Sequence, residues 1–114
     1  MADPPVDKQA LRDLVDNDSA FLTRLIETFL DDCKTYLAAL RSAVEEEDAA
    51  TLQKEAHGLK GAVANLKAEP AREAARRLEE IGRSGAMEEA DRALDRLETE
   101  IERLRSVLAE MTEK

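Results

Sequence analysis

The chain has 114 residues, a hydrophobic fraction of 43%, an aromatic fraction of 3% and a formal net charge of -9. This length suits one compact domain over residues 1–114, and the abundance of alanine, leucine, glutamate and arginine favours an all-α fold. The acidity argues against a nucleic-acid partner, which requires clustered cations, and against binding to an anionic membrane surface.

The first half of the chain predicts a tail and two helices. Residues 1–6 are expected to be a flexible tail, and VDKQALRDLV, residues 6–15, predicts a short helix. Asp18 or Ser19 can cap a long amphipathic helix over residues 21–44, because apolar residues recur there every three or four positions.

The second half predicts three more helices. Asp48 can cap a helix that carries an apolar stripe from Leu52 to about residue 68. Pro70 suits the first turn of a further helix, which the segment GRSG, residues 82–85, should end. Residues 87–111 then carry apolar side chains at alternating spacings of three and four, which predicts a last long helix.

Four long helices with short connections favour an antiparallel four-helix bundle with an extra short N-terminal helix. A different interpretation is a helical adaptor that dimerises as a coiled coil through residues 87–111. The helix over residues 21–44 has a broader apolar face than a two-stranded coiled coil requires, so the bundle, and a monomer, are preferred.

Several features suggest the cytoplasm. No apolar run approaches the roughly 20 residues that span a bilayer, and the opening MADPPVDK lacks the basic and apolar regions of a secretory signal. The single cysteine, Cys33, can form no internal disulfide and falls among apolar residues at helical spacing. We therefore expect it to be a small buried side chain rather than a nucleophile.

The only histidine, His57, is expected to face water. With about 100° per residue, it lies roughly 140° from the centre of the apolar stripe of its helix. The same geometry puts Gly61 and Ala64 close to His57, with Ala68 near them, and these three form what we call the small-residue surface. Glycine in a helix costs about 1 kcal/mol relative to alanine. Its presence at Gly61 suggests that another molecule approaches the backbone there, whereas the pattern explains Gly58 poorly.

Cations gather beside this histidine although the chain is acidic. Residues 53–68 hold Lys54, Lys60 and Lys67 against the single acid Glu55. Lys60, three residues after His57, can reach a group carried on the imidazole and would favour a phosphoryl dianion there.

The segment AHGLKGAVANLKA resembles the signature of histidine-containing phosphotransfer (HPt) domains. The matching positions are His57, Leu59, Lys60, Gly61, Ala62 and Leu66. The resemblance extends over about residues 12–110, through FLTRLIETFLDDCKTYLAALRSAVEEED before the motif and AREAARRLEEIGRSG after it. The family often has glycine where Lys67 stands, which puts partner selectivity in question.

The resemblance implies that His57 accepts a phosphoryl group and exchanges it with an aspartate of a response-regulator receiver domain, within a relay that a hybrid sensor histidine kinase feeds. Lys60 would offset the phosphoryl charge, and Gly61 would leave room for the receiver. We assign Ala64, Lys54, Lys67 and Ala68 to the same partner surface. No cofactor or metal of its own is expected, since magnesium would come from the receiver.

Other functions fit the sequence less well. No phosphate-binding glycine-rich loop supports an autonomous kinase. The dimerising histidine domain of sensor kinases usually has an acidic residue where Gly58 follows His57. One histidine makes a zinc site improbable, and the carboxylate pairs Glu45–Glu46 and Glu79–Glu80 are interpreted as solvated helix faces.

Overall fold

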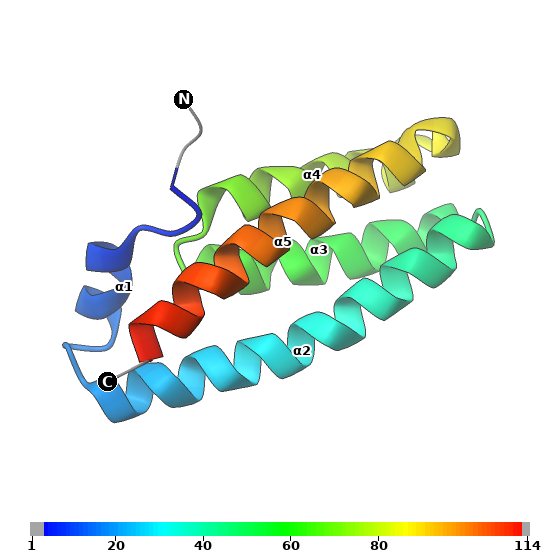
Figure 1. The fold of residues 1–114 in the computed structure, drawn as a ribbon. Helices are drawn as coiled ribbons and strands as arrows, with labels where there is room; N and C mark the ends of the chain where they lie inside the picture. Colours follow the sequence, from blue (N-terminus) through cyan, green and yellow to red (C-terminus); the bar gives the residue numbers. More distant parts are fainter. Residues whose placement is uncertain (1–3, 113–114) are drawn as a thin grey trace.

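The computed structural model describes residues 4–112 (Figure 1). Within them every regular element is helical, as the sequence predicts. In chain order they are α1 Lys8–Leu14, α2 Ser19–Glu45, α3 Ala49–Asn65, α4 Glu69–Ser84, the short 3-10 helix η1 Met87–Glu89, and α5 Ala90–Thr112.

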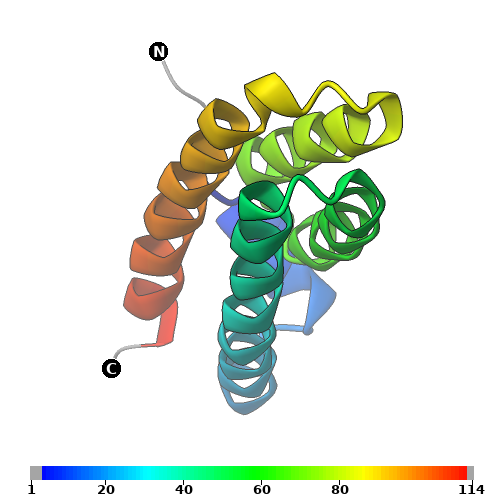
Figure 2. The same cartoon turned by 90° about the vertical axis from the view of Figure 1, so that its right-hand side faces the viewer.

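Helices α2 to α5 form an antiparallel four-helix bundle, and α1 lies across one end of it (Figures 1 and 2). The molecule measures 43 × 29 × 18 Å along its principal axes. Helices α3 and α4 make the most extensive contact of any pair. The predicted bundle with a short N-terminal helix is therefore confirmed.

Aspartates begin three of the helices. The side chains of Asp7, Asp18 and Asp48 each accept a hydrogen bond from the backbone N–H three residues later, at 3.0, 3.1 and 3.1 Å. Such caps satisfy N–H groups that the first helical turn leaves unpaired. Of the two expected caps for α2, Asp18 is the one used.

Two helix boundaries differ from the prediction. Helix α3 ends at Asn65 instead of near residue 68, because the chain turns through Lys67, whose φ is 61°. Met87 belongs to η1, so α5 begins at Ala90.

The core is built mainly from leucines, and the predicted stripe of α5 lies inside it. The largest fully buried side chains are Leu11, Ile26, Leu40, Leu52, Leu59, Leu66, Leu78, Leu94, Leu97, Leu104, Leu108 and Val63. Since α5 packs on α4 and α2 of its own chain, its apolar stripe is not left for a dimeric coiled coil.

The N-terminal segment joins the core earlier than expected. Val6 is buried, and the N–H of Asp7 donates to the carbonyl of Lys67 at 3.0 Å. Val6 therefore belongs to the packed domain rather than to a tail, while residues 1–3 of the expected tail lie outside the described residues.

Cys33 is buried as expected, and desolvation raises the pKa of its thiol to about 11. No helix among residues 4–112 has the length and apolar character that crossing a membrane demands.

Candidate functional site

His57 lies in the second half of α3 with its imidazole in solvent. Its side chain is 69% exposed, while Ala56 and Leu59 beside it are completely buried. One turn further along, Gly61 is exposed, and a Cβ built on it would meet no atom within 4 Å. The helix therefore presents the ring beside open backbone, in the direction that the periodicity predicts.

A buried carboxylate holds the inner side of the imidazole. Glu79 of α4 has a side chain only 6% exposed, and its Oε2 lies 2.9 Å from His57 Nδ1. Its Oε1 lies 2.6 Å from Lys60 Nζ, and Arg83 donates to Oε2 at 3.2 Å. The interpretation of Glu79 as part of a solvated helix face was wrong, because the packing of α4 on α3 turns this side chain inwards.

The ion pair with Lys60 sets the charge state of Glu79. The hydrogen bond from Lys60 lowers the pKa of Glu79, and the hydrogen bond from His57 adds to this effect against the opposing effect of burial. An ionised carboxylate only accepts hydrogen bonds, so His57 Nδ1 must carry the proton in this contact. In a neutral ring Nε2 then keeps its lone pair.

A close approach of two helices brings Glu79 to this place. A Cβ on Gly82 of α4 would lie 2.6 Å from the backbone nitrogen of Gln53 and 2.8 Å from the carbonyl oxygen of Ala49, both on α3. Only glycine allows the backbones to come so near each other. Glu79, one turn before Gly82, is thereby pressed against α3.

Gly58 also has a packing reason that the sequence pattern did not reveal. A Cβ at this position would lie 2.7 Å from Cε1 and 2.9 Å from the hydroxyl of Tyr36 on α2. Gly58 directly follows His57 in the chain. Because it has no side chain, the ring of Tyr36 can pack against α3 at this point.

Most residues of the expected partner surface are at least partly exposed, with one correction. Gly61, Lys54 and Lys67 are exposed, and Ala64 is partly exposed. Ala68 is only 1% exposed, so the prediction that it contributes to the small-residue surface was wrong. The helical geometry used for that prediction no longer applies, because α3 has ended and Ala68 is already the N-cap of α4.

The site as described is a solvent-facing imidazole with adjacent cations. Lys60 and Arg83 both contact Glu79, so two positive charges flank one negative charge beside the ring. Within residues 4–112, no group of three or more His, Cys, Asp or Glu side chains is placed to hold a metal ion.

Comparisons with known proteins give the family of this chain. The family model described as Hpt domain matches residues 24–107. The chain belongs to the Hpt domain family. This Hpt domain is also similar to the crystal structure of histidine-containing phosphotransfer protein B (HptB) from Pseudomonas aeruginosa PAO1, with 26% identity and a TM-score of 0.90. The match covers 97% of this chain and 96% of that one.

The sequence matched no curated protein. Family membership and the match to HptB identify the chain as a histidine phosphotransfer protein of a phosphorelay, which interacts with receiver and kinase partners.

Proposed function

We propose that His57 accepts a phosphoryl group from the aspartyl phosphate of a response-regulator receiver domain, or returns it, without any kinase activity of this chain. The observation that carries the proposal is the contact of His57 Nδ1 with buried Glu79, which leaves Nε2 as the free nitrogen of an imidazole that is 69% exposed.

In the forward step, the Nε2 lone pair attacks phosphorus, a nitrogen–phosphorus bond forms, and the bond between phosphorus and the aspartate oxygen breaks. The aspartate leaves as a carboxylate. The ring then carries a positive charge that the Nδ1–H shares with Glu79, so the same carboxylate that orients the ring also stabilises the product.

Lys60 and Arg83 supply the positive charge near the transferred group. Lys60 Nζ is 2.6 Å from Glu79 Oε1 with a quarter of its side chain exposed, so a rotation about its side-chain bonds can bring it towards a phosphoryl oxygen. Arg83 contacts the same carboxylate and is 59% exposed. Charge-assisted hydrogen bonds of this kind favour a phosphoryl dianion.

The receiver would dock over α3 at the open backbone of Gly61 and Ala64, with Lys54 and Lys67 at the edge of the contact. Its own acidic pocket would supply the magnesium that phosphoryl transfer requires. We further propose that the protein is a monomer of the cytoplasm and that a hybrid sensor kinase supplies its phosphoryl groups. A free, buried Cys33 suits a reducing compartment.

Labelling by phosphorylated receivers tests the proposal. A panel of receivers from the same cell, each radiolabelled on its aspartate, is mixed with the protein, and the label is mapped by mass spectrometry and tested for acid lability. The wild type should gain an acid-labile phosphoryl group on His57.

The matched control is His57→Gln, which should stay unlabelled and keep the helicity of the wild type, because the ring it removes lies mostly in solvent. Label on this variant would place the phosphoryl site elsewhere. A wild-type protein that no receiver labels would favour the adaptor interpretation instead.

A further inference from the structure

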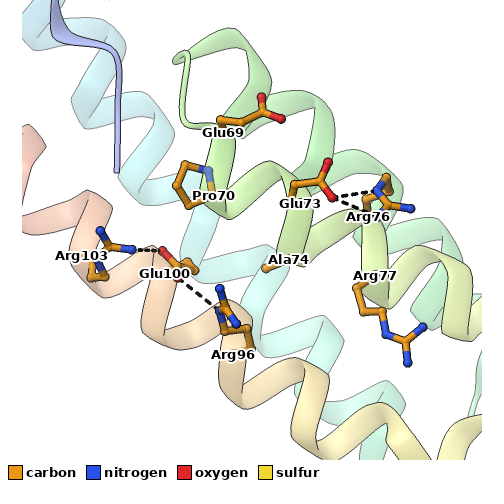
Figure 3. Close-up of a pocket in the computed structure, with 9 residues that line it drawn as sticks. All are labelled: Glu69, Pro70, Glu73, Ala74, Arg76, Arg77, Arg96, Glu100 and Arg103. Atoms are coloured by element: carbon orange, nitrogen blue, oxygen red, sulfur yellow. Dashed lines mark hydrogen bonds and ion pairs between the residues drawn. The ribbon is translucent and has the colours of Figure 1, made fainter. Parts of the chain in front are cut away.

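A second charged feature lies between α4 and α5, in a groove of about 400 Å³. Four arginines and three glutamates line it around a floor that includes Pro70 and Ala74: Arg76, Arg77, Arg96, Arg103, Glu69, Glu73 and Glu100 (Figure 3). The lining therefore has a net positive charge on a chain whose total is -9. The phosphotransfer site uses none of these residues.

The groove opens away from His57. At 3.6 residues per turn, Pro70 and Arg77 lie about 160° to 180° around α4 from Glu79, which contacts the imidazole. A molecule in the groove would thus leave the exposed face of α3 free for a receiver.

A buried carboxylate orients one arginine in the groove. Glu100 has a side chain only 6% exposed, and it accepts from Arg96 Nε at 3.2 Å and from Arg103 Nη1 at 2.6 Å. Among residues 4–112, Arg96 Nη1 and Nη2 have no hydrogen-bond partner, and the side chain is 70% exposed. The inner edge of this guanidinium is fixed, and its outer edge is available to a second carboxylate.

Arg77 supplies a comparable donor from the opposite wall. It pairs through Nη2 with Glu89, and both side chains are about half exposed. Ion pairs between exposed side chains contribute little to stability, so an incoming carboxylate can replace Glu89 at low cost. Arginine presents its N–H groups in a planar fork that matches a carboxylate.

We propose that this groove binds an acidic peptide segment of a partner protein, with carboxylates on Arg77 and Arg96. Its walls run about 10 to 12 Å along the helices, from residues 69 to 77 on α4 and from 96 to 103 on α5. That length holds about three to four residues of extended peptide, and a small inorganic anion would occupy only part of it.

The test is a titration of the isotope-labelled full chain with an acetylated, amidated hexaglutamate peptide at low salt, followed through backbone amide shifts. Saturable shifts centred on residues 70–77 and 96–103 support the proposal. An equally long glycine–serine peptide should cause none. Shifts that do not saturate, or that centre on α3 around His57, would overturn it.

Arg77→Gln should weaken hexaglutamate binding about fivefold, because one charge-assisted fork is lost. Arg24→Gln, an exposed arginine of α2, should leave the affinity unchanged. Arg96→Gln serves as a second variant. Its thermal unfolding, compared with that of the wild type, shows whether the protein stays folded when buried Glu100 loses the hydrogen bond from Arg96 and keeps the one from Arg103.

Two further results would contradict the proposal: equal affinity of Arg77→Gln and wild type, or inorganic phosphate saturating the same amides as tightly as the peptide. Labelling of His57 in Arg77→Gln should equal that of the wild type. The groove and the phosphotransfer site are therefore tested independently.

Discussion

Glu79 contacts His57, Lys60 and Arg83 at once, so it links the ring to both cations. Glu79→Gln removes the charge that balances a phosphorylated ring, and an amide can offer Nδ1 either an oxygen or an NH2 group. We expect labelling of His57 to slow about tenfold in single-turnover measurements, as is common when the partner of a functional histidine is changed.

The neighbouring residue offers a matched control for this variant. Glu80 contacts only Arg76 among the described residues and is partly exposed, so Glu80→Gln should transfer at the wild-type rate. Equal rates for the two variants would contradict the role assigned to Glu79.

The same substitution should change the pH dependence of stability. The pKa of Glu79 is lowered in the folded protein, so its stabilising effect is complete above the unfolded value of about 4.3 and is lost as the pH falls through the folded value. Urea unfolding should show Glu79→Gln less stable by about 1–2 kcal/mol at pH 7. The difference should shrink below about pH 4, and a constant difference would refute the ion-pair explanation.

At the residue scale, the spacing within one helix predicts the direction of His57 but not the burial of Glu79. The outward direction of His57 follows from the period of its own helix. Glu79 stands 22 residues away, and the spacing of α3 says nothing about it. A helical wheel for α4 is the signal that separates Glu79 from Glu80, because it puts Glu79 on the same face as the buried Ala75 and Gly82.

At the scale of elements, the distance between α3 and α4 controls the site. Gly82→Ala would push a methyl group into the α3 backbone at Gln53 and Ala49, so the helices must separate. We expect a loss of about 1–3 kcal/mol of unfolding free energy, measured by urea denaturation, together with slower labelling of His57 as Glu79 moves away from the ring.

Gly61→Ala is the matched control, because the added methyl group meets no atom within 4 Å and improves helix propensity. It should stabilise the protein by about 0.5–1 kcal/mol. Similar effects of the two substitutions on stability would contradict the close approach of α3 and α4.

Lys67 stands in the turn between α3 and α4, in a backbone conformation that favours glycine. Its φ of 61° is a left-handed conformation, which costs a residue with a side chain about 1–2 kcal/mol. Lys67→Gly should therefore raise the unfolding free energy by up to about 1 kcal/mol, since the greater flexibility of unfolded glycine offsets part of the gain. Lys67→Ala, which keeps a Cβ, should give no such gain, and equal thermal stability of the two variants would refute the argument.

The helices themselves follow from sequence more directly than their ends. Aspartate caps locate the starts of α2 and α3, Pro70 locates the first turn of α4, and apolar periodicity locates the body of each helix, since all these signals are local. The end of α3 was misplaced by about three residues because a lysine occupies a conformation in which glycine would mark the turn. That error also put Ala68 on the wrong side of the boundary.

At the scale of the whole molecule, burial decides between the bundle and the coiled coil. Leu97, Leu104 and Leu108 of α5 are completely buried within one chain, so dimerisation through this helix would require opening the core. Periodicity alone could not exclude that interpretation, because a stripe that fits a bundle also fits a coiled coil.

A monomer is therefore the expected state in solution. Light scattering coupled to size exclusion should give a mass near 12.7 kDa. A net charge of -9 adds repulsion between copies, so the mass should stay constant when the protein is diluted and in salt from low to physiological concentration. A mass near twice that value that persists on dilution would contradict the monomer.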